Sequence, residues 1–311
     1  MTTTVYRTCT LCEAACGLAI DVDGGRIVAA RGDEHDFASR GYVCAKGVAI
    51  GAVHDDPDRL RQPMKRLRSG EFVAAGWDEA FADIVSRLQA IQAAHGKDAV
   101  ALYIGNPVIH NHGALLLRQS LFNVLGTRNA YSASSQDTAP RFATSFHLYG
   151  SAFVTPVPDV DRCDFFLCIG ANPYVSNGSA WTVPDVKGRM RALRRRGGRL
   201  VVVDPRRTET AREADEHVAI RPGTDHALQF AMAAVLLEEG LVDRAALAAQ
   251  VTGWDEVARR LRRVDRDAAA AATGIGRATI ERLARELATA SRGVAYSRIG
   301  VCNNRFGTLG T

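Results

Sequence analysis

The sequence predicts an α/β protein in which a small β-rich domain precedes domains built on a doubly wound, mostly parallel sheet. Two observations lead to this fold class. From Trp77 onward, segments with helical periodicity alternate with short apolar runs, as in βαβ units. Before residue 61 the chain is rich in cysteine and glycine and has only short strand patterns, so its apolar core is thin and a bound metal is expected to stabilise it.

We expect three domains in the 311 residues. The cysteine-rich domain covers residues 1–60, a first α/β part covers 61–150, and a Rossmann-like α/β part covers 151–311. In the first domain, residues 17–22 and 26–30 are predicted strands, because the Asp-Gly-Gly sequence between them is typical of a hairpin turn.

The first α/β part is predicted to begin with a long helix and a buried strand. Apolar residues recur at intervals of three and four after Trp77, so we expect a helix that Asp78 caps and Gly96 ends. The apolar run at residues 99–104 then predicts the buried strand.

The Rossmann-like part contains three apolar runs, at residues 164–169, 200–203 and 217–220, and each predicts a strand. Crossovers between them indicate parallel pairing, and parallel sheets bind ligands outside the carboxyl ends of their strands. Cys163 and Cys168 lie five positions apart, so strand alternation would place these small apolar side chains on opposite faces.

Composition indicates a folded soluble protein, with 47% hydrophobic and 23% charged residues. The net charge of +5 is modest, and the densest basic run, residues 189–199, is explained by a solvated helix, so no nucleic-acid partner is expected. We find no apolar stretch long enough to span a membrane, and no signal sequence or twin arginine at the start. A cytoplasmic location is therefore expected, with export only through a partner that carries a signal.

Four cysteines carry the strongest chemical signal. Cys9, Cys12, Cys16 and Cys44 have the spacing C-x2-C-x3-C-x27-C, and four thiolates are the usual ligands of a [4Fe–4S] cluster. Lys46 follows two residues later, as a cation at the edge of the cluster. Seven cysteines, an odd number, do not indicate a disulfide framework. Structural zinc remains an alternative, although zinc sites usually pair two C-x2-C hairpins.

Polar residues follow each predicted strand of the Rossmann-like part. Glycine allows a backbone to approach a phosphate, an aspartate accepts from a ribose or base, and arginine or threonine holds a diphosphate. The chain has no G-x-G-x-x-G or Walker loop. Turns rich in glycine, proline and aspartate also connect the elements of α/β sheets that bind no ligand there. The candidate residues are Gly170, Asn172, Pro173, Asp204, Arg206, Thr208, Pro222, Gly223 and Asp225.

The stretch 8–47 resembles the amino-terminal cluster domain of the molybdopterin oxidoreductases, the molybdenum or tungsten bis-pterin enzymes of the dimethyl sulfoxide reductase type, which include formate dehydrogenases and nitrate reductases. Residues 54–60 and 77–80 follow the same family pattern. The polar segments after the three predicted strands, which we call the first, second and third polar breaks, are residues 170–173, 204–211 and 221–225. They are similar to the family's Gly-x-Asn-Pro, Asp-Pro-Arg-x-Thr-x-Thr-Ala and Arg-Pro-Gly-Thr-Asp. The resemblance implies a [4Fe–4S] cluster and a molybdenum or tungsten bis-molybdopterin guanine dinucleotide cofactor.

The resemblance also implies residue roles. Lys46 would lie between cluster and pterin, and the nine candidate residues would hold the guanine dinucleotide. The family's spacing from metal ligand to proline puts Asp137 in the ligand position, although Ser134 and Ser135 are nearby oxygen ligands and Asp137 has a plain alternative role as a helix cap. Formate dehydrogenases place a thiolate or selenolate followed by histidine there, so this chain departs from them.

The implied function is two-electron oxidation or reduction of a small-molecule substrate, with electrons passed through the cluster to a partner protein or subunit. Family members are usually at least twice as long, so we expect either a catalytic chain or the amino-terminal part of one, with a further carboxy-terminal portion as a possible partner. Two alternatives are a zinc-stabilised α/β nucleotide-binding module and a non-catalytic iron–sulfur electron-transfer subunit.

Overall fold

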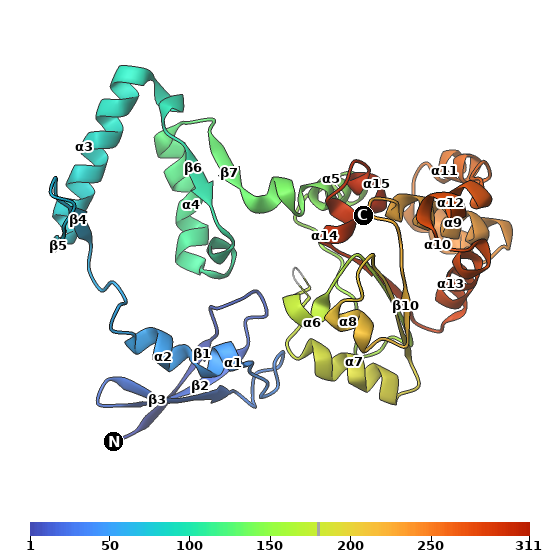
Figure 1. Ribbon diagram of the computed structural model, residues 1–311, viewed down its shortest axis with the longest axis horizontal. Coiled ribbons are helices and arrows are strands. Elements are labelled where there is room, and N and C mark those ends of the chain that lie inside the picture. Colours follow the sequence, from blue (N-terminus) through green and yellow to red (C-terminus); the bar gives the residue numbers. More distant parts are fainter. Residues whose placement is uncertain (179–180) are drawn as a thin grey trace. The chain divides into compact units, whose positions relative to one another are not determined.

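The computed structural model describes residues 1–178 and 181–311. The chain forms two compact units, Met1–Ala133 and Ser134–Thr311, whose elements are traced in Figure 1. The division into three domains at residues 60 and 150 stays a prediction.

The first unit begins with a three-stranded antiparallel sheet in the order β1-β2-β3. Its strands are β1 (Thr3–Thr8), β2 (Gly17–Asp23) and β3 (Arg26–Gly32). The β2–β3 hairpin confirms the two predicted strands, and its turn uses Gly24 and Gly25 at φ values of 54° and 81°, which favour glycine. Two short helices follow, α1 (Ala45–Val48) and α2 (Ile50–Asp55).

The core of this small sheet is thin, as expected. Its buried members include Leu18 and Ile20 from β2, and also the cysteines Cys9 and Cys16. Cys9 and Cys16 are therefore neighbours of the only large aliphatic side chains buried in this core among the described residues. The fold of the domain and the state of its thiols are coupled for this reason.

The rest of the first unit alternates short strands with helices. Its elements are β4 (Met64–Arg66), β5 (Phe72–Ala74), α3 (Trp77–His95), the 3-10 helices η1 (Lys97–Ala99) and η2 (Asn106–His110), β6 (Leu102–Ile104), α4 (His112–Leu125) and β7 (Ala130–Ser132). The strands β4 and β5 form an antiparallel hairpin, and β6 and β7 form a parallel pair.

Two expectations for this region need correction. Gly76, not Asp78, is the N-cap of α3, and no side chain caps the helix; Asp78 lies inside the first turn, where its charge favours the helix dipole. The predicted strand at 99–104 is shorter, Leu102–Ile104, and only partly buried: its first residue, Ala99, belongs to η1, and among the described residues its only strand partner is β7. Gly96, at a φ of 83°, ends α3 as predicted.

The helices α3 and α4 bury little apolar surface within this chain. No residue of α3 is buried, and Leu125 is the buried residue of α4. Their apolar stripes point outward, as illustrated by exposed fractions of 58% for Phe81 and 76% for Leu116. Tertiary packing therefore contributes less to these helices than to those of the second unit.

The second unit contains a four-stranded parallel sheet in the order β10-β9-β8-β11. Its strands are β8 (Phe165–Ile169), β9 (Arg199–Val203), β10 (Glu216–Val218) and β11 (Gly293–Ser297). The first three confirm the predicted strands, and β11 is an additional edge strand. Its register with β8 pairs Ser297 with Ile169, so both strands end at the same edge.

Alternating residues of β8 enter two different hydrophobic cores. Phe165, Leu167 and Ile169 pack with residues of α9 and α13, whereas Phe166 and Cys168 pack with residues of α7 on the other face. Helices on both faces define a doubly wound sheet. The second-unit helices are α5 (Ala139–Tyr149), α6 (Pro173–Ser176), α7 (Val186–Arg195), α8 (Glu209–Arg212), α9 (Asp225–Glu238), α10 (Arg244–Gln250), α11 (Trp254–Leu261), α12 (Arg266–Thr273), α13 (Arg277–Thr289), α14 (Ile299–Cys302) and α15 (Gly307–Gly310).

Cys163 and Cys168 belong to the same core, contrary to expectation. Strand alternation begins only at Phe165, and Cys163 lies in the turn before it, so the period of two does not extend back to that residue. Both remain buried small apolar side chains.

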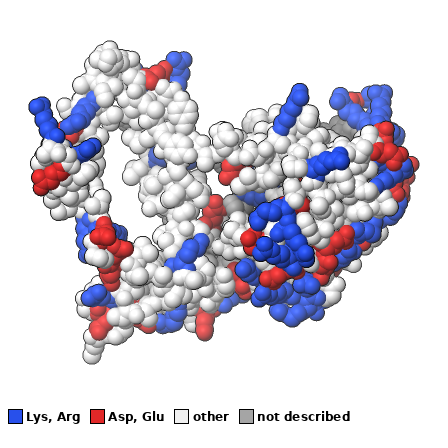
Figure 2. Space-filling view, in the orientation of Figure 1, with Lys and Arg blue, Asp and Glu red and all other residues white. Residues whose placement is uncertain are grey.

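The surface is mixed in charge. On the face drawn in Figure 2, Lys and Arg side chains are interspersed with Asp and Glu over the second unit. No described helix is both long enough and apolar enough to span a bilayer.

Candidate functional site

The β1–β2 connection and the start of α1 position the four cysteines. Cys9 follows β1 and Cys16 precedes β2, and the Cys9 N–H donates to the Cys16 carbonyl at 2.8 Å, which closes the loop that carries Cys12. Cys44 is the N-cap of α1. All four are free thiols, with Cys9 and Cys16 buried and the other two half-buried. The loop and the helix therefore supply the sulfurs separately.

The thiols act on one another electrostatically, as members of one site must. Burial is the main cause that raises the pKa of Cys16, to about 11, and its three partner cysteines add to the shift. Burial also raises the pKa of Cys9, while the charge of Lys46 opposes that shift. A metal centre bound through these sulfurs would displace their protons, because the thiolate is the ligand form.

Four thiolates can bind either an iron–sulfur cubane or a single zinc ion. Within residues 1–178 and 181–311, no group of three or more His, Cys, Asp or Glu side chains lies in an arrangement that could hold a metal ion. A cubane takes each thiolate on a different iron atom, so its ligands stand further apart than those around one zinc ion. The geometry of the four free, mutually interacting thiols is compatible with either centre.

Lys46 is exposed on α1, and its charge reaches the thiol of Cys9. The glycine after it, Gly47, is buried against the same site: a Cβ there would overlap Cγ2 of Val43 and approach Sγ of Cys9 to 3.9 Å. Gly47 therefore allows α1 to approach the cysteine loop. The sequence signal for this role was its place directly after Lys46.

A second contact that supports the cysteine loop was also not predicted from the sequence. The Gly17 N–H, adjacent to Cys16, donates to Ser39 Oγ at 3.1 Å, and Ser39 Oγ donates to Asp36 at 2.7 Å. The hydrogen bonds from Ser39 keep the pKa of Asp36 below its ordinary value. This network ties the loop before Cys44 to the cysteine loop.

The three predicted polar breaks meet at the carboxyl edge of the parallel sheet. Gly170, at a φ of 57°, follows β8, and a Cβ there would lie 2.9 Å from the backbone nitrogen of Val301, so the close approach requires glycine. The Asn172 side chain accepts from Thr210 Oγ1 at 2.7 Å and donates to Glu209 at 2.7 Å. Asn172 thus links the first break to the second, and Pro173 starts α6.

The second break carries a carboxylate. Asp204 accepts from the Arg206 N–H at 2.8 Å, and burial raises its pKa. Thr208 is buried and caps α8, accepting from the Ala211 N–H at 3.1 Å. Arg206 is exposed and lies 3.4 Å from Glu209, so its guanidinium remains accessible to an anion.

The third break brings a second carboxylate. Gly223, with a φ of 77°, follows Pro222, and Asp225 starts α9 with only 4% of its surface exposed. Burial raises the pKa of Asp225, and the charge of Asp204 contributes in the same direction. A buried carboxylate, Asp225, and a half-buried one, Asp204, interact at one edge, where they fit the N–H and O–H donors of a nucleotide. His226, whose Nδ1 is buried without a hydrogen-bond partner in the described chain, lies beside them.

Asp137 lies in the second unit, just before α5. The N-cap of α5 is Thr138, whose side chain makes no capping hydrogen bond, and Asp137 is the residue before it. The Asp137 charge contributes to raising the pKa of Cys302, after burial, which places the carboxylate near α14. Ser134 is half-buried and Ser135 exposed in the preceding turn. A hard carboxylate oxygen at this position suits a high-valent molybdenum or tungsten ion.

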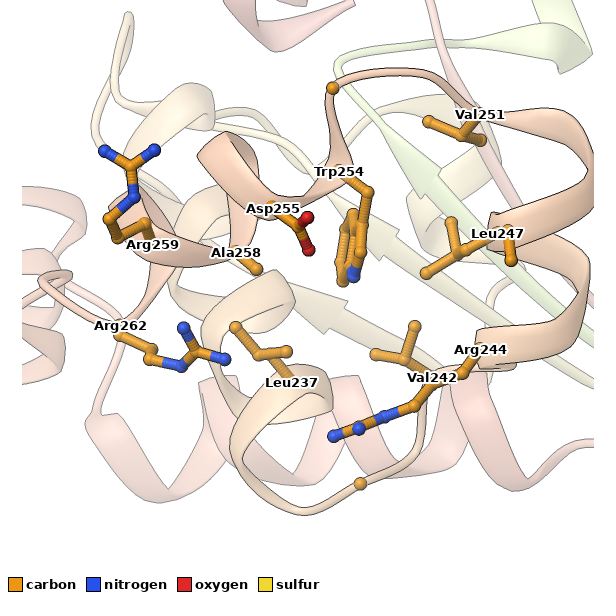
Figure 3. Close-up of a pocket in the computed structure, with 13 residues that line it drawn as sticks. Leu237, Val242, Arg244, Leu247, Val251, Trp254, Asp255, Ala258, Arg259 and Arg262 are labelled. Carbon is orange, nitrogen blue, oxygen red and sulfur yellow. The ribbon is translucent and has the colours of Figure 1, made fainter.

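A cavity of about 670 Å³ lies elsewhere in the second unit, among α9, α10 and α11. Figure 3 shows the indole of Trp254 pointing into it, with Leu237 and Val242 across the opening and Arg244 and Arg262 at its sides. None of the predicted site residues lines this cavity. The predicted chemistry is concentrated instead at the cysteine loop and the sheet edge.

The described residues thus combine a small domain that carries four cysteines with a doubly wound sheet whose carboxyl edge carries three polar segments. The chain belongs to the molybdopterin oxidoreductase family. The family model described as "Molybdopterin oxidoreductase" matches residues 59–281, more than half of the chain, and the "Molybdopterin oxidoreductase Fe4S4 domain" model matches residues 2–54.

Individual relatives agree with this assignment. The chain is 29% identical to formate dehydrogenase H of Escherichia coli over 96% of this chain and 41% of the relative. It is 29% identical to a nitrate reductase of Shewanella frigidimarina over 88% of this chain and 29% of the relative. The structure of acetylene hydratase from Pelobacter acetylenicus superposes with a TM-score of 0.80 at 25% identity, over 98% of this chain and 41% of that chain. The chain thus spans less than half the length of these relatives.

Family membership confirms the predicted family, the α/β fold class and the cofactor class, a molybdenum or tungsten pterin with a [4Fe–4S] cluster. The roles of individual residues stay predictions that rest on the geometry above.

Proposed function

We propose that the chain is the catalytic chain, or the amino-terminal part of the catalytic chain, of a molybdenum or tungsten oxidoreductase. It would oxidise or reduce a small-molecule substrate by two electrons and pass them singly through the [4Fe–4S] cluster. The observation that carries this proposal is the convergence of four free thiols and Lys46 in the segment that the Fe4S4 model matches.

The chain's own residues have separable tasks. The four cysteines bind the cluster, and Lys46 supplies a positive charge beside it that favours the reduced state. At the sheet edge, Gly170 keeps the backbone close, while Asp204 and Asp225 accept hydrogen bonds from the guanine dinucleotide of a bis-molybdopterin cofactor. When bound, the metal and pterin supply the two-electron chemistry. Asp137 offers a carboxylate oxygen to the metal.

Further features complete the proposal. We infer an electron-transfer partner protein or subunit, because a cluster that passes single electrons needs an acceptor or donor. A cytoplasmic location fits the seven cysteines, all of them free thiols, since reducing compartments keep thiols reduced.

The test is an anaerobic purification of the chain followed by assays of iron, acid-labile sulfide, molybdenum, tungsten and extracted pterin. We expect four irons and four sulfides per chain on the basis of the cubane stoichiometry, and pterin with a guanine dinucleotide. Zinc in place of iron would support the zinc-stabilised nucleotide-binding module and overturn the proposal. A complete cluster without any pterin would support an electron-transfer subunit instead.

A further inference from the structure

One face of α11 changes from buried to half-buried along the helix. Trp254, Ala258 and Leu261 follow one another at intervals of four and three residues, so they share this face. Ala258 and Leu261 are buried, with 4% and 6% of their surfaces exposed, and α11 packs against α9. Trp254, in the first turn, is only half-buried. Its indole points instead into the cavity of about 670 Å³ (Figure 3).

The wall around the indole is aliphatic. Leu237 comes from the last turn of α9, Val242 from the loop after that helix, and Leu247 from α10. Val251, the C-cap of α10, completes this wall. Pockets for small molecules have volumes of roughly 300–1,000 Å³ and combine apolar and aromatic walls with a few polar groups. The cavity agrees with this description in both size and lining.

Two arginines of the lining can bind an anion. Figure 3 shows the side chains of Arg244 and Arg262 reaching inward from opposite sides of the cavity. Both residues are exposed, and neither makes a hydrogen bond or an ion pair with another of the described residues. The third arginine of the lining, Arg259, is paired with Glu256. The guanidiniums of Arg244 and Arg262 therefore keep all their N–H donors for a ligand.

A neutral donor and one carboxylate complete the polar part of the lining. The indole N–H of Trp254 makes no hydrogen bond within the described part of the chain, and its nitrogen lies at the end of the ring that points into the cavity (Figure 3). The carboxylate of Asp255 lies beside the indole. Arg244 and Arg262 against Asp255 leave one positive charge, so the lining favours a monoanion over a dianion.

The cavity is separate from the carboxyl edge of the parallel sheet. The helix α9 begins with Asp225 at that edge, has 14 residues, and carries Leu237 in its last turn. With a rise of 1.5 Å per residue, the two ends of such a helix stand about 20 Å apart. A small molecule bound against Leu237 therefore does not reach Asp225, so the cavity serves a ligand other than the cofactor proposed above.

We propose that this cavity is a binding site for an aromatic monocarboxylate. The ring of the ligand stacks on the indole of Trp254 and covers the aliphatic wall. Its carboxylate accepts hydrogen bonds from Arg244 and Arg262, because a planar guanidinium presents parallel N–H donors that match two carboxylate oxygens. No residue of the cysteine loop or of the sheet edge takes part, so the inference does not depend on the proposed function.

The probe is 2-naphthoate, and neutral 2-naphthamide is its matched control. Isothermal titration calorimetry of the full chain at constant ionic strength should show saturable binding of 2-naphthoate. The amide should bind about tenfold more weakly, because the charge-assisted hydrogen bonds are lost. Acetate, which has the charge but no ring, should also bind about tenfold more weakly. Equal affinity for the acid and the amide would overturn the proposal, and so would the absence of saturable 2-naphthoate binding.

Variants test where the probe binds. Arg244→Gln and Arg262→Gln should each weaken 2-naphthoate binding about threefold to tenfold, because each removes a charged donor from a partly exposed site. Trp254→Leu keeps an apolar side chain but removes the ring, and should weaken binding about tenfold. Arg263→Gln is the matched control, since Arg263 is exposed and adjacent to Arg262 but does not line the cavity.

The control variant should change the affinity for 2-naphthoate by less than about twofold, because its charge lies outside the cavity and is screened by solvent. The same affinity in wild type, Arg244→Gln, Arg262→Gln and Trp254→Leu would place the probe elsewhere and overturn the proposal. The comparison of acid with amide uses the wild-type chain alone, so it decides the question even where a variant does not fold.

Discussion

The Asn172 side chain holds Thr210 at the carboxyl edge of the parallel sheet, accepting from its N–H at 3.2 Å and from its hydroxyl at 2.7 Å. Thr210 is fully buried, and its hydroxyl also accepts from the Tyr174 N–H at 3.1 Å. The first and second polar breaks are therefore one hydrogen-bonded unit. A residue that looked like a ligand contact in the sequence has an observed role in positioning.

Removing this link should destabilise the second unit. Asn172→Ala leaves the buried Thr210 N–H and hydroxyl without their acceptor, which should cost about 1–3 kcal/mol in the free energy of unfolding. Urea unfolding followed by circular dichroism measures this. Asn123→Ala, which removes an exposed amide on α4 that bonds only Gln119 in the described structure, is the control and should change stability by less than about 0.5 kcal/mol. Equal effects for the two variants would contradict the positioning role.

Gly47→Ala should impair cluster assembly. The added Cβ would overlap the Val43 side chain and contact Cys9 Sγ, so α1 would have to move away from the cysteine loop. We expect a lower iron and sulfide content per chain, measured after anaerobic purification. Gly76→Ala is the matched control, because a Cβ at that position meets no atom within 4 Å and its φ is −70°. Full cluster content in Gly47→Ala would show that the close approach is not needed.

Local sequence signals predicted the centre of the sheet but not its edge. The strand β8 is buried at every position and β9 at four of five, so their continuous apolar runs stand out in the sequence. In contrast, β11 has mixed exposure and includes glycine and serine. It becomes a strand by pairing with β8, more than a hundred residues away, and this pairing has no local signal.

The same difference divides the site residues. The cysteines and the three breaks were found because each is a compact motif or directly follows a recognisable strand. The hydrogen bond from Arg141 to the Ser297 carbonyl was not predicted, because it depends on where β11 ends and on the packing of α5 against α14. The predicted N-cap of α3 was wrong for a simpler reason. The helix begins one residue before Asp78, so this acid lies within its first turn and Gly76 occupies the N-cap position.

The metal-free protein should lose stability at alkaline pH through Cys16. Burial raises the pKa of this thiol from 9.0 to about 11, so the folded state binds the proton more tightly than the unfolded state. The resulting stabilisation is fully present below pH 9.0 and is lost as the pH rises through about 11. Cys16→Ala lacks this contribution. Urea midpoints of wild type and variant should therefore converge over this interval, whereas parallel curves would exclude the effect.

Amide hydrogen exchange should be faster in helices that bury little apolar surface than in helices that bury more. The helix α3 has no buried residue, whereas α9 has six and α13 has three. Burial of apolar residues sets most of the free energy of local opening. Mass spectrometry of the full chain should show exchange in α3 at least tenfold faster than in α9. Comparable protection in both helices would mean that α3 is covered in solution by another molecule or a second copy.

Lys46 should affect the reduction potential of the cluster but not its assembly. The side chain is exposed on α1, outside the core, and its positive charge acts on the Cys9 thiol. Lys46→Ala should therefore leave iron and sulfide content unchanged. The reduction potential should fall, because a nearby cation favours the more negative, reduced cluster, and electron transfer should slow. Spectroelectrochemical titration measures the potential, and stopped-flow reduction measures the rate. Lys65→Ala removes an exposed lysine paired with Glu79 and should alter neither quantity. An unchanged potential and rate in Lys46→Ala would show that Lys46 is only a surface residue.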